Sequence, residues 1–347
     1  MKALVLHAYN HLRIEGMTDP EPGPHEVVVA IRACGICGSD VHGMDGSTGR
    51  RQPPIVMGHE ASGVIAVVGA EVRDWRAGDR VTFDSTASCG ECAYCQRGQI
   101  NLCDCRRVFG VSCGDYRQHG AFARYLSVPQ HILYRVPDSL SFEHAAFVEP
   151  LSVAVHAVGR TGASPDDTAV VIGAGVIGLL TMQVLRARGC QRVIAVDVDE
   201  SRLGIARLCG AALVLNSAKE DALAKILDDT NGAGAALVFE AVGVEATVDT
   251  AVRCAAKGGS VVLIGNVSPR VGMALQAVVT RELSLLGSCA SAGEYPACLE
   301  LMASGAVDVA PLISAVAPLA EGPEWFRRLH DREAGLLKVI LTPGDEK

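Results

Sequence analysis

The sequence predicts an α/β protein in two parts: a β-rich first domain and a second domain built on a doubly wound parallel sheet. Short β-like runs separated by Gly and Pro precede Glu149, and the character of the chain changes after this residue. From Thr168 onward, apolar strands alternate with helical segments. Such alternation is typical of parallel strands connected by helices that cover both faces of the sheet.

The expected elements follow from the composition and apolar patterning of each segment. In the first domain, strands are expected at residues 27–31, 61–68 and 80–83. In the second, strands are expected at residues 169–172, 192–197, 212–215, 237–240 and 260–265, with helices that end at Arg188 and start at Ser201. The tail is expected to be helical at 297–304 and 324–331 and to close with a strand at 337–342. We interpret the tail as a return to the first domain, which gives the boundaries 1–152, 153–290 and 291–347.

Composition and charge narrow the functional classes. The 347 residues are 49% hydrophobic and 20% charged, which is typical of a soluble globular protein with room for two domains. The net charge of −8 provides no general attraction to nucleic acid or to an anionic membrane. The sequence contains neither a secretory signal nor an apolar run of the ~18 residues that cross a bilayer. Thirteen cysteines in this context favour thiols and metal sites in a reducing compartment, so a cytoplasmic protein is expected.

A glycine-rich hexapeptide marks the first turn of the second domain. The expected strand leads into Gly173-Ala174-Gly175-Val176-Ile177-Gly178, a G-x-G-x-x-G pattern that also opens an expected helix. In this context Gly173 permits a tight turn, Gly175 lets a pyrophosphate approach the backbone, and Gly178 lets helix and strand pack closely. The amino end of the helix adds unpaired N–H groups and a positive dipole. The loop, with Val176 and Ile177, is therefore expected to bind a dinucleotide.

Asp197 ends the following strand, and this position sets the expected cofactor. Its carboxylate would accept hydrogen bonds from the ribose 2′-OH and repel a 2′-phosphate, which favours NAD over NADP. Arg202 lies shortly after it and could reduce the exclusion of NADP. A simple cap at the end of a strand is the alternative for Asp197, and the surrounding motif favours the binding role.

Four cysteines lie close together in a Gly-containing segment. Cys89, Cys92, Cys95 and Cys103 have the spacing C-x2-C-x2-C-x7-C. Four thiolates complete a tetrahedral shell, which is the closed arrangement of a structural zinc. Free thiols or a redox pair are the alternative, and the tight grouping favours zinc. Cys105 and Cys113 lie nearby but outside this spacing.

A second set of zinc-binding residue types is spread along the chain. His59 and Glu60 lie in the pattern G-H-E-x2-G-x5-G-x2-V, with Cys37 upstream and Glu149 downstream. A catalytic zinc takes three protein ligands and leaves one position open for water or substrate, so this set predicts an enzyme. Cys34 and Cys37 also form a C-x-x-C, but we favour Cys37 as a zinc ligand and Cys34 as a packed residue.

Together these residues resemble the zinc-dependent medium-chain dehydrogenase superfamily, whose members combine a GroES-like domain with a Rossmann domain. The resemblance covers essentially the whole chain. Its markers are G-I-C-G-S-D-V-H at residues 35–42, the G-H-E element, the four-cysteine segment and the G-A-G-V-I-G loop. E-P-L-S-V-A-V-H at residues 149–156 is similar to the polyol branch, which includes sorbitol (L-iditol) and galactitol-1-phosphate dehydrogenases. Simple alcohol dehydrogenases usually carry a cysteine ligand where this chain has Glu149.

The resemblance implies a catalytic zinc held by Cys37, His59 and a glutamate. In polyol dehydrogenases the carboxylate after G-H binds the metal, and the E-P glutamate often acts through the metal-bound water. The sequence leaves open how Glu60 and Glu149 share these roles.

The resemblance also implies a route for the substrate proton. Ser39 matches the hydroxyl that relays this proton, and His42 matches the surface end of the relay, reached through the cofactor ribose. Asp40 matches a residue that orients a ligand or caps a turn, and it is not expected to be catalytic.

The implied activity is the reversible, NAD-linked oxidation of a secondary alcohol of a polyol or sugar alcohol to the ketose. Residues 287–293 offer neither the Arg nor the Tyr that sorbitol dehydrogenases carry in the comparable stretch, so sorbitol itself is in doubt. Threonine, a 2,3-diol or a simple alcohol are alternative substrates, and an idle relative that only binds NAD and zinc is an alternative of another class. The family implies a homodimer or homotetramer, in which residues 283–287 form an interface strand or a core strand.

Overall fold

The computed structural model describes residues 1–113 and 116–344. The chain forms two compact units, and each unit is assembled from separate stretches. The first holds Met1–Glu149, Tyr295–Ala303 and Ile313–Lys347, and the second holds Pro150–Glu294 and Ser304–Leu312. The second unit thus also includes residues 150–152, 291–294 and 304–312, which the expected boundaries 1–152, 153–290 and 291–347 placed outside it.

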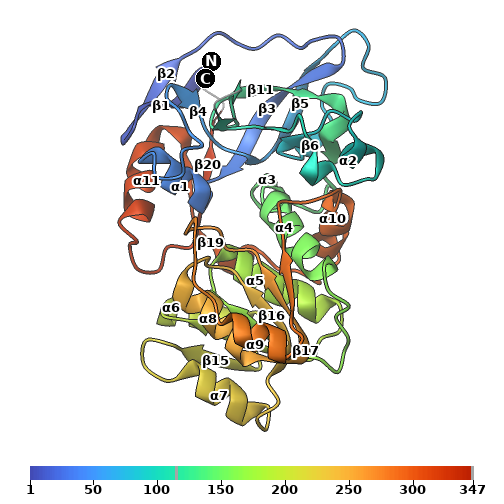
Figure 1. Cartoon of the computed structure of the whole chain (residues 1–347). Coiled ribbons are helices and arrows are strands. Elements are labelled where there is room, and N and C mark those ends of the chain that lie inside the picture. Colours follow the sequence, from blue (N-terminus) through green and yellow to red (C-terminus); the bar gives the residue numbers. More distant parts are fainter. Residues whose placement is uncertain (114–115, 345–347) are drawn as a thin grey trace. The chain divides into compact units, whose positions relative to one another are not determined.

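The first unit is a β-rich structure around a seven-stranded sheet in the order β12-β6-β5-β3-β20-β19, with β11 also paired to β3. Its strands are β1 (Lys2–Ala8), β2 (His11–Gly16), β3 (Glu26–Gly35), β4 (Ile55–Val56), β5 (Glu60–Val68), β6 (Arg80–Phe83), β7 (Thr86–Ala87), β8 (Arg107–Val108), β9 (Val111–Ser112), β10 (Arg117–Gln118), β11 (Tyr125–Pro129), β12 (Leu133–Arg135), β19 (Ile313–Pro318) and β20 (Lys338–Thr342). Its helices are α1 (Gly38–Met44), α2 (Ala93–Gln96), α3 (Phe142–Ala145), α10 (Tyr295–Ala303) and α11 (Gly322–His330) (Figure 1). Among the described residues of this sheet, β19 and β20 pair in parallel, and the other strand pairings are antiparallel.

Three strands of this sheet meet at one point. Gly35, at the end of β3, pairs with Glu60 at the start of β5 and with Ile340 of β20 on the other side. Both neighbours run antiparallel to β3. The residues that follow β3, begin β5 and begin β20 are therefore brought together, although they lie far apart in the sequence.

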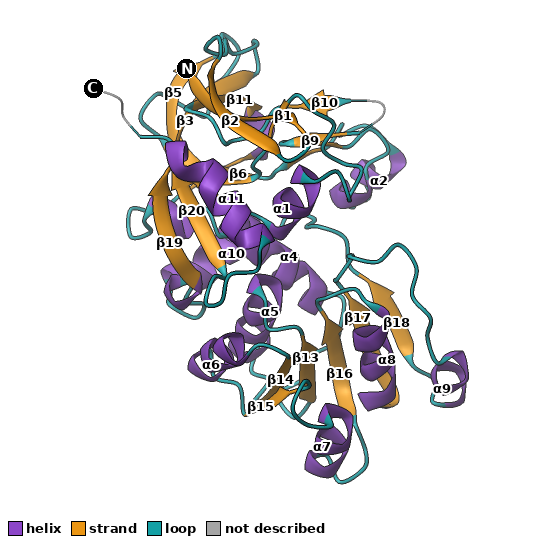
Figure 2. Cartoon of the chain, turned by 90° about the vertical axis from the view of Figure 1, so that its left-hand side faces the viewer, coloured by secondary structure: helices purple, strands orange, loops and turns teal. Residues whose placement is uncertain are grey.

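The second unit is a six-stranded parallel sheet in the order β15-β14-β13-β16-β17-β18. Its strands are β13 (Thr168–Ile172), β14 (Arg192–Asp197), β15 (Leu213–Asn216), β16 (Ala235–Glu240), β17 (Ala255–Leu263) and β18 (Ser284–Gly287). Its helices are α5 (Val176–Ala187), α6 (Glu200–Leu208), α7 (Ala222–Asp229), α8 (Glu245–Cys254) and α9 (Leu275–Thr280), while α4 (Val148–Gly159) begins at the end of the first unit's main stretch. Figure 2 shows α5 and α6 on one side of the strands and α8 and α9 on the other. This arrangement confirms the doubly wound sheet, with strand order 3-2-1-4-5-6.

The core of the second unit explains why its strands read as continuous apolar runs. Val170, Ile172, Ile194, Val238 and Val261 are all buried in one cluster. A parallel sheet covered by helices on both faces buries both sides of each strand, so the side chains need not alternate between apolar and polar.

Two expected strands are confirmed with the same limits, one in each unit. They are the strand at 80–83 in the first unit and the strand at 192–197 in the second.

One strand begins earlier than expected. β17 was expected at 260–265, yet it runs from Ala255 to Leu263 through Gly258 and Gly259. Its pairing with β16 shifts register between Ala235 and Leu237, and a Cβ at Gly259 would lie 2.9 Å from the carbonyl oxygen of Ala236. Gly258 and Gly259 therefore allow a close, irregular approach of two strands.

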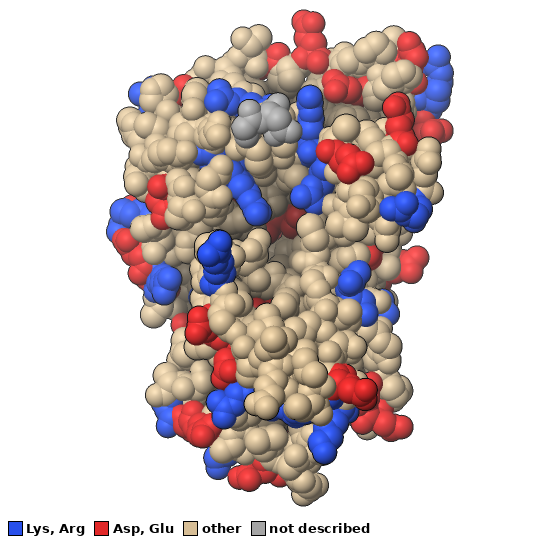
Figure 3. All heavy atoms as spheres, in the orientation of Figure 1, with Lys and Arg blue, Asp and Glu red and all other residues tan. Residues whose placement is uncertain are grey.

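Two surface properties bear on the functional classes considered above. On the face shown in Figure 3, basic and acidic side chains are interspersed rather than gathered in broad areas of one sign. Among the helices of the described residues, none is both long enough and apolar enough to cross a membrane.

The glycines of the loop after β13 give a prediction that separates folding from binding. A Cβ at Gly178 would lie 1.7 Å from the carbonyl oxygen of Gly173, whereas a Cβ at Gly175 would meet nothing within 4 Å. Gly178→Ala should therefore destabilise the second unit by about 3 kcal/mol or more, measured by thermal or urea unfolding. Gly175→Ala should fold normally and lose dinucleotide affinity. Equal stability of the two variants would contradict this packing.

Candidate active site and metal centres

The candidate active site in the first unit is built at the junction of β3, β5 and β20. Cys37 directly precedes α1, two residues beyond the end of β3, and Glu60 is the first residue of β5. Gly58, just before His59, has φ +93, and a Cβ there would lie 2.9 Å from the sulfur of Cys34 and from the backbone of Phe122. The turn into β5 therefore requires glycine at this position, in both conformation and space.

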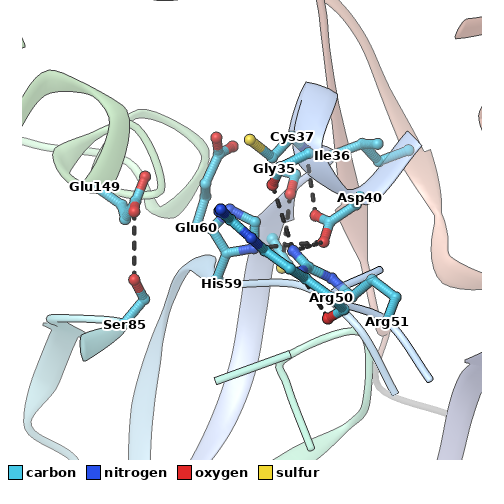
Figure 4. A network of polar contacts seen from close by, with 12 residues as sticks. Gly35, Ile36, Cys37, Asp40, Arg50, Arg51, His59, Glu60, Ser85 and Glu149 are labelled. Carbon is cyan, nitrogen blue, oxygen red and sulfur yellow. Dashed lines mark hydrogen bonds and ion pairs between the residues drawn. The ribbon is translucent and has the colours of Figure 1, made fainter. Parts of the chain in front are cut away.

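Cys37, His59 and Glu60 form a group that could hold a metal ion. One donor atom from each lies within 4.8 Å of the others, and Figure 4 shows the three side chains turned toward one another. His59 and Glu60 are buried and Cys37 is partly buried. Thiolate, imidazole and carboxylate are the ligand types of a catalytic zinc with three protein ligands, and so this donor set fits zinc.

Asp40 connects two members of this group. Its Oδ2 accepts a hydrogen bond from the backbone N–H of Cys37 at 3.4 Å, and its Oδ1 lies 3.4 Å from Nδ1 of His59. The second contact lacks hydrogen-bond geometry, and Nδ1 of His59 has no hydrogen-bond partner among the described residues. Because Nδ1 faces Asp40, Nε2 is the nitrogen left for a metal, as in other histidine ligands oriented by a carboxylate.

The charges around Asp40 favour its ionised form. Burial raises the pKa of Asp40, but His59 and the guanidinium of Arg51 outweigh burial and hold this pKa well below its usual range. Burial likewise lowers the pKa of His59, but Asp40 and Cys37 outweigh it and raise this pKa well above the usual value. The buried carboxylate is therefore charged and paired.

Glu60 has a buried cation as its partner. Nζ of Lys338 donates a hydrogen bond to Oε2 of Glu60 at 2.5 Å and another to the carbonyl oxygen of Ile36 at 3.1 Å. Burial lowers the pKa of Lys338, but Glu60 and Cys37 outweigh it and raise this pKa. Lys338 stays charged, and its pairing with Glu60 offsets the burial of both groups.

Glu149 lies outside the Cys37, His59 and Glu60 group (Figure 4). It is the second residue of α4, and it accepts a hydrogen bond from Oγ of Ser85 at 3.3 Å. Burial raises its pKa to about 7, with Glu60 and Asp84 adding to the shift and His59 opposing it. The two glutamates that the sequence left undecided therefore differ in this structure, because Glu60 stands with the other two donors and Glu149 does not.

Ser39 and His42 lie on α1, immediately after Cys37. They are separated by one helical turn, so they share a face of this helix. Both side chains are exposed in the first unit, whereas Asp40 between them is buried. The geometry thus presents a hydroxyl and an imidazole at the surface, beside the buried donor group.

The four-cysteine segment forms a second donor group. Cys89, Cys92, Cys95 and Cys103 lie together, with Sγ–Sγ distances of 3.5 Å for Cys89–Cys103, 3.6 Å for Cys92–Cys95 and 4.0 Å for Cys89–Cys95. Sulfurs bound to one tetrahedral zinc at ~2.3 Å would be roughly 3.8 Å apart, so this group also fits zinc. Backbone N–H groups of Cys95 and Asp104 lower the pKa of Cys92 to about 6, which favours the thiolate that zinc requires.

The glycine-rich loop lies between β13 and α5 in the second unit. Gly173 has φ +96, and α5 begins at Val176 with Gly175 as its N-cap. Asp197, at the end of β14, accepts hydrogen bonds from the backbone N–H groups of Ala174 at 2.6 Å, Val198 at 2.7 Å and Asp199 at 2.9 Å. Its carboxylate is thus held against the loop. The loop leads directly into the helix amino end, where backbone N–H groups favour phosphate.

The remaining candidate residues belong to neither metal-binding group. Arg202 lies in α6, with Nε 4.0 Å from Oδ2 of Asp199. Cys34 is fully buried in the core of the first unit. Cys105 is exposed and Cys113 is partly buried, and neither belongs to the four-cysteine group.

Sequence reasoning missed three residues that hold the active site together: Arg51, Ser85 and Lys338. Lys338 pairs with a residue 278 positions away, and Ser85 pairs with one 64 positions away. No local spacing reveals such pairs. The only available signal for Lys338 was a lysine at the start of an apolar strand, where a charged side chain needs a buried partner.

Comparisons with known proteins agree with this description. The chain matches the family models for the alcohol dehydrogenase GroES-like domain over residues 23–138 and for zinc-binding dehydrogenase over residues 176–304. It is 33% identical to sorbitol dehydrogenase of Bacillus subtilis (strain 168) over 347 residues, which covers 99% of this chain and 97% of that protein. It is 37% identical to L-idonate 5-dehydrogenase of Vitis vinifera over 311 residues, or 87% of this chain and 84% of that protein.

A solved structure gives the same result for the fold. The zinc-binding dehydrogenase of Sinorhizobium meliloti 1021 bound to NADP superposes with a TM-score of 0.91 at 33% identity, and 99% of each chain is covered. The chain therefore belongs to the zinc-dependent medium-chain dehydrogenase superfamily, in its polyol dehydrogenase branch. The resemblance inferred from the sequence, the fold class and the expectation of an enzyme that uses zinc and a nicotinamide dinucleotide are confirmed.

The four-cysteine group should bind one zinc ion independently of the other donor group. Cys92→Ser removes one of four thiolates, and zinc content should fall from about two ions to about one per chain, together with a lower melting temperature. Cys105→Ser, at an exposed cysteine outside the group, should keep both ions. Metal analysis by mass spectrometry measures both, and full zinc content in Cys92→Ser would contradict the assignment.

The two glutamates should differ in their effect on zinc. Glu60→Gln should weaken zinc binding by more than about 100-fold, because it removes a donor from the three-residue group. Glu149→Gln should keep the zinc and lower kcat. Competition with a chelator measures zinc affinity in both variants. Zinc loss in Glu149→Gln, with retention in Glu60→Gln, would reverse the two roles.

Proposed function

We propose that this protein oxidises a secondary alcohol of a polyol or sugar alcohol to the ketone, reversibly, with NAD as the hydride acceptor. The observation that carries the proposal is the grouping of Cys37, His59 and Glu60, with Glu149 close by but held separately. The relatives named sorbitol dehydrogenase and L-idonate 5-dehydrogenase support a polyhydroxylated substrate.

Cys37, His59 and Glu60 would hold the catalytic zinc. Bound there, zinc supplies Lewis acidity that polarises the substrate hydroxyl and fixes its orientation. Asp40 faces Nδ1 of His59 as an ion-pair partner and accepts a hydrogen bond from the backbone N–H of Cys37, and Lys338 fixes the carboxylate of Glu60. These contacts hold the ligands in place before a substrate binds, so little reorganisation accompanies the reaction.

The substrate proton would leave through α1. Oγ of Ser39 would accept the proton from the substrate hydroxyl while its own hydrogen passes, through the cofactor ribose, to the imidazole of His42 and then to solvent. The positions of both residues on one exposed helix face support this order. A nicotinamide dinucleotide bound at the glycine-rich loop would supply the hydride acceptor.

Glu149 would act at the open position of the metal rather than as a ligand. Its hydrogen bond to Ser85 keeps the carboxyl group available beside the donor group. A group with a pKa of about 7 can both accept and donate a proton near neutral pH. We therefore propose that Glu149 hydrogen-bonds to the water or hydroxyl that occupies the open position.

The loop of Gly173, Gly175, Val176, Ile177 and Gly178 would bind the pyrophosphate of the dinucleotide. Asp197 would hydrogen-bond to the adenosine ribose and disfavour a 2′-phosphate. The positive charge of Arg202 would weaken this exclusion of NADP. The Sinorhizobium meliloti relative was solved with NADP bound, so the preference for NAD over NADP is tested directly.

Asp197→Asn tests the cofactor preference. The change keeps the size of the side chain and removes the charge that repels a 2′-phosphate. The ratio of kcat/KM with NADP to kcat/KM with NAD should rise about tenfold, which corresponds to a ~1.4 kcal/mol change in discrimination. Steady-state kinetics with each cofactor give this ratio. An unchanged ratio would contradict the role of Asp197.

The proposed activity is tested by initial rates of NADH formation with zinc-replete enzyme. The substrates are polyols, phosphorylated polyols, threonine, 2,3-diols and simple alcohols, with Cys37→Ser as the inactive control. Selective turnover of polyols is expected. Preference for threonine, a diol or a simple alcohol would replace the substrate class, and no turnover of any alcohol would support an idle relative that only binds NAD and zinc.

We also propose that the protein forms a homodimer through the edge of the second unit's sheet. β18 is an edge strand, paired to β17 on one side, and unprotected edges favour pairing with another strand. The segment between β17 and β18 exposes four large apolar side chains: Val267, Met273, Leu275 and Val279. Exposed apolar groups beside a free edge are typical of a surface covered by a second copy.

Light scattering after gel filtration tests this interface. The double change Leu275→Lys and Val279→Lys should convert the dimer to a monomer, because it places two charges in an apolar contact. Leu208→Lys is a matched control, since Leu208 is exposed at the end of α6. A wild-type monomer at micromolar concentration would contradict the dimer, and an unchanged dimer in the double variant would place the contact elsewhere.

We propose a cytoplasmic location. Four of the cysteines form a group that fits zinc, and thiolate ligands of this kind persist in a reducing compartment.

A further inference from the structure

Arg51 is a buried cation beside the proposed proton relay, and only 3% of it is exposed. Its backbone forms a parallel bridge with Ser112 of β9. The same strand binds both flanking residues: Ser112 donates from its N–H to the carbonyl oxygen of Arg50 at 3.1 Å, and its Oγ accepts from the N–H of Gln52 at 2.6 Å. This segment is therefore fixed at three consecutive residues.

The stem of Arg51 packs against α1 because Gly43 has no side chain. A Cβ at Gly43 would lie 2.3 Å from Cγ of Arg51. The guanidinium can therefore approach the start of α1 from inside the unit. The contacts with β9 fix the backbone of Arg51, and the space at Gly43 admits its side chain.

The guanidinium contacts both functional residues at the start of α1. One nitrogen, Nη2, donates to Oδ1 of Asp40 at 3.0 Å and to Oγ of Ser39 at 3.3 Å. Nη1 donates to the carbonyl oxygen of Arg50 at 3.2 Å. Figure 4 shows Arg51 lying beside Asp40 in this network.

The direction of the contact with Ser39 follows from chemistry alone. A guanidinium has only donors, whereas a serine hydroxyl has one hydrogen and two lone pairs. Arg51 therefore occupies one lone pair of Oγ and leaves the other lone pair and the hydrogen. A group that passes a proton onward needs these two: a lone pair to accept and a hydrogen to release.

The same nitrogen connects Ser39 to the buried ion pair. Nη2 lies 3.3 Å from Oγ of Ser39 and 3.0 Å from Oδ1 of Asp40, so the guanidinium that is paired with Asp40 also fixes the position of the hydroxyl oxygen. Because an N–H of Arg51 takes one lone pair of Oγ, the hydrogen of Ser39 cannot point toward the guanidinium.

We propose that Arg51 is a positioning residue for the proton transfer, which holds Oγ of Ser39 in place and keeps its hydrogen directed away from the guanidinium, as the outward donor. This inference rests on the proposed relay through Ser39. It adds a residue that touches neither substrate nor metal, and that acts through Ser39 and Asp40.

The experiment uses the zinc-loaded full-length protein and the substrate selected by the alcohol panel. Arg51→Met removes every donor of the side chain, and Arg51→Lys keeps a positive charge and N–H donors on a single ammonium nitrogen. Arg50→Met is the matched control, because Arg50 is exposed and contributes only its backbone carbonyl to this network. Ser39→Ala and the double variant Ser39→Ala/Arg51→Met complete a double-mutant cycle. Zinc content, melting temperature, kcat, both KM values and the solvent deuterium isotope effect on kcat are measured.

Arg51→Met should keep about two zinc ions and an unchanged KM for NAD, while kcat falls at least about tenfold, since a positioned proton transfer contributes roughly 10²–10⁴ in rate. The solvent isotope effect should rise because proton transfer becomes slower than hydride transfer. Arg51→Lys should recover part of kcat. Arg51→Met should cause no further loss in the Ser39→Ala background, because the two residues act in one step.

Three results would overturn the inference. An unchanged kcat in Arg51→Met would show that orientation of Ser39 does not depend on this guanidinium. Losses that multiply in the double variant would show that Arg51 acts independently of Ser39. Loss of zinc in both Arg51→Met and Arg51→Lys would assign Arg51 a purely structural role through Asp40. Failure of the proposed function is distinguishable, because the wild-type protein would then oxidise no alcohol at all.

Discussion

The absence of a side chain at Gly35 is the constraint on which the active site depends. Gly35 pairs with Glu60 across β3 and β5, and a Cβ at this position would lie 2.3 Å from Oε2 of Glu60. The carboxylate can therefore turn over the end of β3 toward Cys37 and meet Lys338 from β20. Any side chain at Gly35 would occupy the space in which the glutamate meets its cation.

Charge pairing explains how so many ionisable groups remain buried in one place. Glu60 is paired with Lys338, and Asp40 is paired with Arg51, each with both partners buried. Breaking such a pair by removing one partner typically costs about 3–5 kcal/mol, because the other charge stays buried. The two pairs thereby hold the carboxylates in place, which is what ligand positioning requires. Arg51 has a second role besides its pairing with Asp40, because it also binds the hydroxyl oxygen of Ser39.

Local features of the sequence were sufficient for much of the fold and for the donor groups. The alternation of apolar strands and helices after Thr168 gave the parallel sheet, since each strand and helix carries its own signal. The four-cysteine spacing and the glycine-rich loop are also local, and the structure brings each set together. β17 was expected to begin at residue 260, but it begins at Ala255 and includes Gly258 and Gly259.

Contacts between distant segments lay beyond sequence reasoning. Lys338 and Glu60 meet only because the register of β3 with β5 and β20 aligns their ends. The sequence could not distinguish the roles of Glu149 and Glu60. The hydrogen bond from Ser85 that holds Glu149 apart depends on tertiary structure. Motifs therefore identify the candidate ligands, and strand register determines which of them stand together.

The most direct measurement is anomalous diffraction at the zinc edge from crystals of the zinc-loaded protein with NADH. We expect two peaks per chain, one among the four cysteines and one within ~2.3 Å of donor atoms of Cys37, His59 and Glu60. A second peak bound by Glu149 in place of Glu60, or no second peak, would contradict the catalytic centre described above.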